Sequence, residues 1–263
     1  MNYFEKRYNK ASINQKDVKY DFWRYGNELG KKLDDAEVEY ICSFINELIQ
    51  KESDYKKVRL IDVGCGTGYH AINIFKKLKN DTLNDIEVLC IDTNVNYTEQ
   101  FKHNIINDHD ITKDDCSKFI IKNTSIENIK HFIDESVSKN DKSLINVIMM
   151  VGVVQYLTQA QIYNFSKDLT DLSCKRSFII IKHPLNFSLE LISENEREGC
   201  KYNSEYKSFG RVYMPFSDMF DFVKMEKCYS ESTVCNNDIK KINSKDNTEL
   251  VYITLKSKNI INQ

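Results

Sequence analysis

Short apolar runs recur along the middle of the chain, and longer stretches with apolar residues every three or four positions separate them. Apolar runs of about four to eight residues, bounded by polar ones, are typical of strands that are buried on both faces of a sheet. Such runs predict strands at residues 58–63, 86–91, 118–121, 144–151 and 177–181. The middle of the chain is therefore expected to form a buried sheet.

The stretches between these runs have the spacing of amphipathic helices. They predict helices at residues 69–78, 97–106, 126–137 and 158–172, with Thr158 as the N-cap of the last one. Strands that alternate with helices form a parallel sheet with helices on both faces, joined by right-handed crossovers. The pattern therefore predicts an α/β fold.

The two ends of the chain have different patterns. Residues 1–33 are rich in aromatic side chains without a regular period, and an acidic turn at Asp34 predicts the start of a helix that ends near Lys51. Residues 184–210 are polar and carry few signals. The pattern beyond them predicts a short helix at 215–225 and a closing antiparallel hairpin, with strands at 227–234 and 250–255 around a polar turn at 236–247.

Length and composition limit the class of protein. A chain of 263 residues fits one α/β domain with insertions, and a net charge of −2 does not indicate a nucleic-acid-binding protein. No stretch approaches the roughly 18 apolar residues that cross a membrane, and residues 1–10 lack the apolar core of a signal peptide. None of the eight cysteines forms a Cys-x-x-Cys pair, so we expect no metal site and a reducing, cytoplasmic location.

The most informative segment is the glycine loop, residues 62–68, which joins the first predicted strand to the helix that follows. It reads Asp-Val-Gly-Cys-Gly-Thr-Gly, and glycines there let the backbone turn sharply and approach a ligand closely. The dinucleotide fingerprint Gly-x-Gly-x-x-Gly would need a glycine where this chain has Tyr69. A phosphate-binding P-loop would need Gly-Lys-Ser/Thr at its end, and this too is absent.

The loop instead resembles motif I of the class I S-adenosylmethionine-dependent methyltransferases, an acidic residue followed by alternate glycines. A second likeness is Asp92, which ends the next strand where that family has an acidic residue for the ribose hydroxyls of the cofactor. A carboxylate is suited to that role because it accepts strong, charge-assisted hydrogen bonds. Thr124 stands where many members carry an acidic residue near the adenine, and Val151 begins the segment that resembles the family's contact with the methionine moiety.

The resemblance implies S-adenosylmethionine as the cofactor and a set of residues that hold it. These residues are Asp62, Gly64, Cys65, Gly66, Gly68, Asp92, Thr93, Thr124, Ser125 and Val151.

The resemblance also implies a seven-stranded, mostly parallel, doubly wound sheet with an N-terminal helical and aromatic extension. A single methyltransferase domain would then span residues 1–263. It would comprise a helical lid at 1–52, a cofactor-binding core at 53–183, and a substrate-side insertion with the closing hairpin at 184–263.

The methyl acceptor is less clear from the sequence. His183 follows the fifth strand at its carboxyl end, where ligands bind in open α/β sheets, and it is a candidate general base; a partly buried structural histidine is the alternative. Aromatic and basic residues outside the strands are candidates for the acceptor pocket, although they could equally serve packing or lie in solvated loops. They are Tyr20, Trp23, Tyr25, Tyr156 and Arg211.

Several functions remain open at this point. The leading hypothesis is methyl transfer to an oxygen or nitrogen of a small molecule; the alternatives are a peptide, protein or RNA acceptor, and a non-catalytic scaffold with this fold. DNA is not expected, because the fourth strand lacks the Asn/Asp-Pro-Pro-Tyr/Phe sequence that follows it in the family's DNA amine methyltransferases. The sequence leaves the oligomeric state open.

Overall fold

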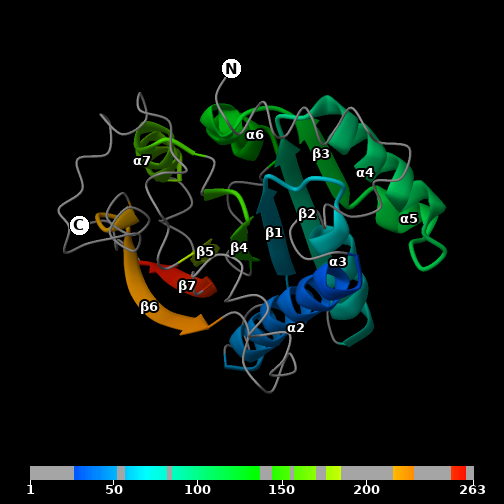
Figure 1. Ribbon diagram of the computed structural model, residues 1–263, viewed down its shortest axis with the longest axis horizontal. Coiled ribbons are helices and arrows are strands. Elements are labelled where there is room, and N and C mark those ends of the chain that lie inside the picture. Colours follow the sequence, from blue (N-terminus) through cyan, green and yellow to red (C-terminus); the bar gives the residue numbers. More distant parts are fainter. Residues whose placement is uncertain are drawn as a thin grey trace.

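A computed structural model describes residues 27–51, 57–81, 85–136, 144–154, 157–169, 176–184, 216–227 and 250–258. Within them, seven strands form one sheet (Figure 1). The strands are β1 (Lys57–Val63), β2 (Asp85–Asp92), β3 (Phe119–Asn123), β4 (Leu144–Val151), β5 (Ser177–Pro184), β6 (Phe220–Lys227) and β7 (Leu250–Ser257).

The sheet has the order β3-β2-β1-β4-β5-β7-β6. Neighbouring strands from β1 to β5 pair in parallel, whereas β7 pairs antiparallel with both β5 and β6. The predicted seven-stranded, mostly parallel sheet is therefore confirmed for the described part of the chain. The strand order reverses direction between β1 and β4, and in open α/β sheets such a switch point is where ligands bind, beyond the carboxyl ends of the strands.

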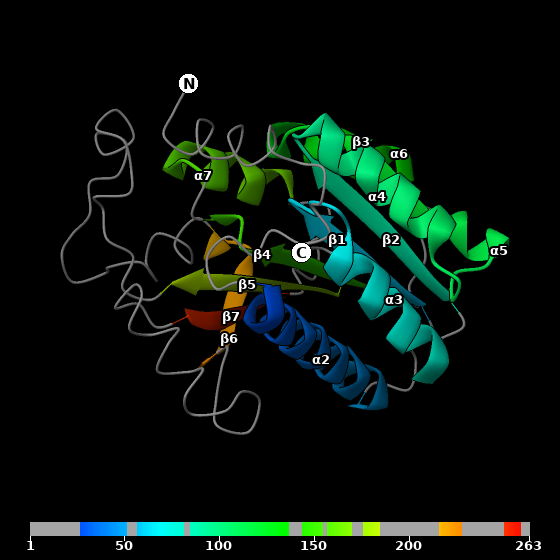
Figure 2. The ribbon, with the colours of Figure 1, turned by 45° about the vertical axis from the view of Figure 1, so that its right-hand side comes forward.

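Helices cover the sheet, and alternate residues of each strand reach different helices. The helical elements are α2 (Asn27–Lys51), α3 (Tyr69–Asp81), α4 (Val95–Asn107), α5 (Lys113–Cys116), η1 (Ile126–Asn128), α6 (Ile129–Ser136) and α7 (Gln159–Asp168). In β1, Leu60 packs into the core that contains α2, α3 and α4, whereas the next residue, Ile61, packs into the core that contains α6 and α7. Figure 2 shows these helices around the sheet. This alternation is the two-residue period of a strand.

Local capping explains where two of the helices start. The Thr158 side chain accepts a hydrogen bond from the Gln161 amide, and the Gln161 side chain accepts one from the Thr158 amide, so α7 begins with a capping box. The predicted N-cap at Thr158 is confirmed. Asn94 caps α4 in a similar way, through a hydrogen bond from the Asn96 amide.

The N-terminal helix ends at Lys51 as predicted, but its predicted start is wrong, and so is the type of the element predicted at 215–225. The N-terminal helix begins at Asn27 rather than near Asp34, because Leu33 is buried and continues its apolar face. The helix predicted at 215–225 is mostly strand β6, which pairs along its length with β7. A register shift between Phe222 and Lys224 interrupts the alternation of β6 and leaves Phe222 and Val223 exposed, which hid the strand pattern.

Other predictions about the ends of the chain fall outside what the structure describes. Of the strand predicted at 227–234, only Lys227 is described, as the last residue of β6, and residues 1–26 and 185–215 are not described. The division of the chain at 52/53 and 183/184 stays a prediction. Among the described residues, no helix is long and apolar enough to cross a membrane.

Candidate cofactor site

The glycine loop leaves β1 at Val63 and enters α3 at Tyr69. Gly64, Gly66 and Gly68 have φ angles of +75°, +54° and +86°, in the left-handed region that side chains rarely adopt. A Cβ added to Gly64 would lie 2.2 Å from Val153 Cγ2, and one added to Gly68 would lie 2.2 Å from Phe101 Cδ2. These two glycines are therefore needed for close packing as well as for the turn.

Gly66 differs from its two neighbours. An added Cβ there would meet no heavy atom of the described structure within 4 Å. Its glycine therefore serves the backbone turn and leaves the space beside the loop open. Such a position allows a ligand to approach the backbone closely.

The end of β2 holds the glycine loop in place. The amides of Gly64 and Cys65 both donate to the Ile91 carbonyl oxygen, at 2.8 and 3.0 Å. The Gly66 amide donates to Asp92 Oδ2 at 2.9 Å. The loop follows β1, and Asp92 ends the adjacent strand β2. The two therefore form one hydrogen-bonded unit.

Asp92 connects the loop to the end of β3 as well. Its Oδ1 accepts a hydrogen bond from the Asn94 amide at 2.8 Å, and its carbonyl oxygen accepts from the Thr124 amide and Asn123 Nδ2, both at 3.0 Å. Burial raises the pKa of the Asp92 carboxyl, and the backbone donors oppose this shift. Since a carboxylate has about four acceptor positions, those left after the backbone bonds suit hydroxyl groups.

Asp62 lies near the end of β1, two residues before Gly64, with 4% of its surface exposed. Burial raises the pKa of its carboxyl to about 7, the nearby charge of Asp92 adds to the rise, and the charge of His70 opposes it. Its charge therefore changes near neutral pH. Shifted carboxyl groups of this kind are frequent at functional sites.

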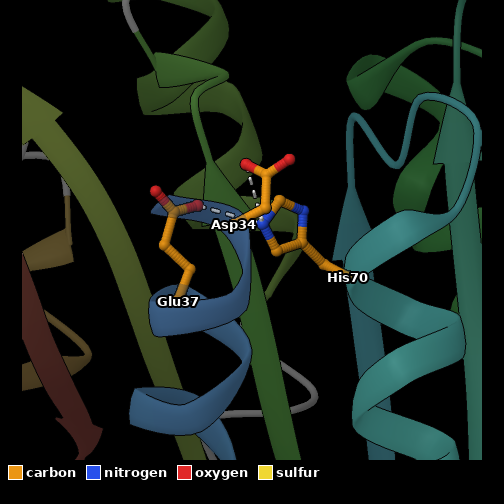
Figure 3. Close-up of side chains that lie close together, drawn as sticks. All are labelled: Asp34, Glu37 and His70. Atoms are coloured by element: carbon orange, nitrogen blue, oxygen red, sulfur yellow. Dashed lines mark hydrogen bonds and ion pairs between the residues drawn. The ribbon is translucent and has the colours of Figure 1, made fainter. Parts of the chain in front are cut away.

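Asp62 and its neighbour His70 belong to a larger charged cluster. His70 Nε2 lies 3.0 Å from Glu37 Oε2 and 3.8 Å from Asp34 Oδ1, so the first turn of α3 faces α2 (Figure 3). The other Glu37 oxygen accepts a hydrogen bond from Lys182 Nζ at the end of β5. Sequence reasoning missed Asp34, Glu37 and Lys182, because only the packing of α2 brings these distant residues together.

The same cluster has the donor types of a metal site. One ligand atom from each of Asp34, Glu37 and His70 lies within 4.8 Å of the others. However, the Lys182 ammonium group already pairs with Glu37. The Lys182 ammonium group thus already supplies the positive charge that a metal ion would bring to this cluster.

The other predicted cofactor residues that the structure describes lie at the same edge of the sheet. Val151 ends β4, and Gly152 after it has a φ of +69°. Asn128 Nδ2 donates to Thr124 Oγ1 at 3.2 Å, which places Thr124 and Ser125 in the turn after β3. The fold thus brings the ends of β1, β2, β3 and β4 to one site, although contact with a cofactor remains a prediction for each residue.

The candidate substrate residues are not placed by the structure. His183 lies in β5 and pairs in register with Val251, but its side chain is outside the described part. The rest also lie outside the described residues, and their roles stay predictions. They are Tyr20, Trp23, Tyr25, Tyr156 and Arg211.

Comparison with known proteins supports the class that the loop indicates. A family model described as a methyltransferase domain matches residues 31–145, which run from α2 to the start of β4. A search among curated proteins finds no match to this sequence.

A solved methyltransferase structure shares the fold. N-methyltransferase NodS from Bradyrhizobium japonicum, in complex with S-adenosyl-L-homocysteine, is 10% identical with a TM-score of 0.53, over 96% of this chain and 97% of that chain. A SAM-dependent methyltransferase from Leishmania major is 14% identical with a TM-score of 0.48, over 85% of this chain and 73% of that one. The family match and the fold confirm the resemblance to class I S-adenosylmethionine-dependent methyltransferases.

Proposed function

We propose that this protein binds S-adenosylmethionine at the glycine loop and transfers its methyl group to an oxygen or nitrogen of a small molecule. The observation that carries the proposal is the hydrogen bond from the Gly66 amide to Asp92 Oδ2, beside a position where no described atom would contact an added Cβ. This bond connects two features of the site: a stretch of backbone that a ligand can approach, and a carboxylate that suits hydroxyl groups. The family match and the fold support the choice of cofactor.

The residues of this site would divide the work of binding. Asp92 would accept hydrogen bonds from the ribose hydroxyls, and the turn at Thr124 and Ser125 would lie against the adenine. The backbone from Gly64 to Gly68 would hold the methionine portion, whose ammonium group the negative charge of Asp62 would attract.

S-adenosylmethionine would supply a methyl group on a sulfonium. The acceptor atom would bond to the methyl carbon as the carbon–sulfur bond breaks, and S-adenosylhomocysteine would leave. The protein then needs chiefly to align the acceptor and to exclude water, and orientation of this kind can contribute roughly 7–11 kcal/mol. Where the acceptor must lose a proton, we assign the general base to His183. The aromatic residues Tyr20, Trp23 and Tyr25, together with Tyr156 and Arg211, would wall the acceptor pocket.

The wider arrangement is part of the same proposal. Residues 1–52 would form a helical lid, the sheet would be doubly wound, and residues 184–263 would lie on the substrate side. In the described part, Cys65, Cys90 and Cys116 are free thiols, which supports a reducing, cytoplasmic location.

A peptide, protein or RNA acceptor is the second candidate, and a scaffold without catalysis is the third. Calorimetric titration with S-adenosylmethionine and S-adenosylhomocysteine, with NAD as the control, tests the cofactor. Methyl transfer from labelled cofactor then separates the acceptors: small amines, phenols and carboxylates are offered in one set, and peptides and RNA in another. Cofactor binding with transfer to peptides or RNA alone would contradict the small-molecule proposal.

A further inference from the structure

Glu37 occupies a buried position where three elements meet near the glycine loop. Only 1% of its surface is exposed. One carboxylate oxygen pairs with His70 of α3 at 3.0 Å, and the other accepts a hydrogen bond from Lys182 of β5 (Figure 3). A single side chain of α2 thus connects the first turn after the loop to the carboxyl end of a central strand.

The charges in this cluster depend on one another. Burial opposes ionisation of Glu37, but the charge of Lys182 and the hydrogen bond with His70 lower its pKa to about 2. Burial also opposes a charged imidazole, yet Glu37 first, and then Asp34 and Asp62, raise the pKa of His70 to about 9. His70 therefore carries a proton at neutral pH, and Glu37 contributes most to holding it there.

The effect of His70 extends to the glycine loop. Its charge is the largest influence that favours ionisation of Asp62, against burial and the charge of Asp92. Loss of the His70 proton would therefore shift Asp62 towards its neutral form near pH 7. Other groups also face this pair. They are Asp34 on α2, Lys182 on β5, and the Cys65 and Cys90 thiols, whose pKa values burial and neighbouring groups raise.

We propose that Glu37 is a positioning residue that holds a protonated His70 near Asp62. Through His70, Glu37 would set the charge of Asp62 in the glycine loop. The N-terminal helix would thereby control cofactor affinity without touching the cofactor. The inference rests on the proposed function, because the charge of Asp62 would act on the ammonium group of the cofactor's methionine portion. The charges of Lys182 and His70 face those of Glu37 and Asp34, so this role needs no metal ion.

The test compares Glu37→Gln with a matched control, Glu39→Gln. Glu39 lies on the same helix and also pairs with α3, through Lys77, but its side chain is 60% exposed. The affinity for S-adenosylhomocysteine is measured from about pH 6 to about pH 8. The wild type and Glu39→Gln should bind more tightly as the pH rises through about 7, while the midpoint in Glu37→Gln should move up. A shift of one pH unit corresponds to about fivefold weaker binding at pH 7.

A second measurement needs no cofactor. The His70 imidazole is followed by NMR against pH and assigned with His70→Gln; it should stay protonated at pH 8 in the wild type and lose its proton at lower pH in Glu37→Gln. An unchanged midpoint of binding, or a His70 titration unaffected by Glu37→Gln, would overturn the inference. A wild type that binds no S-adenosylhomocysteine would instead refute the proposed function, and the NMR titration would still decide whether Glu37 holds the His70 proton.

Discussion

The Gly66 amide and the Asp92 carboxylate, from the ends of two adjacent parallel strands, form a 2.9 Å hydrogen bond. The bond fixes the most open glycine of the loop against the acidic residue that is expected to hold the ribose. This contact therefore joins the glycine loop and Asp92, the two parts of the proposed cofactor site.

Replacement of Asp92 by alanine should weaken S-adenosylhomocysteine binding more than tenfold. In the proposed site the variant would lose charge-assisted hydrogen bonds to the ribose, which contribute about 1.5–3 kcal/mol each, and the loop would loosen at Gly66. Calorimetry measures the effect. Asp85→Ala is the matched control, because Asp85 begins the same strand, pairs with Lys57 at the surface and should leave affinity unchanged. Equal affinity of Asp92→Ala and the wild type would remove Asp92 from the site.

Alanine at Gly66 and alanine at Gly68 should have different effects. Gly68→Ala should lower the free energy of unfolding by about 2–4 kcal/mol, because its Cβ overlaps the buried Phe101 ring and its φ is positive. Gly66→Ala should cost only the backbone strain, about 1–2 kcal/mol, but should weaken cofactor binding strongly. Chemical denaturation and calorimetry separate the two effects. If Gly66→Ala binds S-adenosylhomocysteine as tightly as the wild type, the cofactor does not approach the backbone at Gly66.

Most residues of the glycine loop site could be predicted from the sequence. Asp62, the three glycines and Asp92 follow from sequence because they lie at the ends of consecutive strands, and parallel strands bring such ends together. The Glu37–His70 pair could not be found in the same way. Its two residues are 33 positions apart, and only the packing of α2 on α3 brings them within 3.0 Å.

The closing strands show a second limit. In β6, Phe220 and Phe222 alternate with Asp221, which is a strand pattern, but the irregularity before Lys224 breaks it. Pairing with β7 decides that this segment is a strand, and pairing is a property of the folded sheet rather than of the local sequence.

Stability should depend on pH through His70. Its pKa rises from 6.5 to about 9 on folding, so its stabilising contribution is fully present below about pH 6.5 and is lost as the pH rises through about 9. The difference in unfolding free energy between the wild type and His70→Gln should therefore shrink from pH 7 to about pH 10. We expect a change of the order of 2 kcal/mol, since the side chain is about one-fifth exposed. A constant difference over this range would show that His70 is not charged in the folded protein.

Replacement of His183 by alanine should lower kcat by about 10²–10⁴-fold for an acceptor that must lose a proton, while affinity for S-adenosylhomocysteine stays the same. The control is His109→Ala, because His109 is exposed in the turn after α4. Steady-state kinetics across pH measures the effect. A kcat that falls equally in both variants, or in neither, would exclude His183 as the base.

The glycine loop and Asp92 should together bind S-adenosylmethionine. Calorimetric titration of the wild type with S-adenosylmethionine, S-adenosylhomocysteine and NAD tests it most directly. The account predicts micromolar binding of the first two, no binding of NAD, and loss of both interactions in Asp92→Ala. A folded protein that binds neither, or that binds NAD instead, would contradict it.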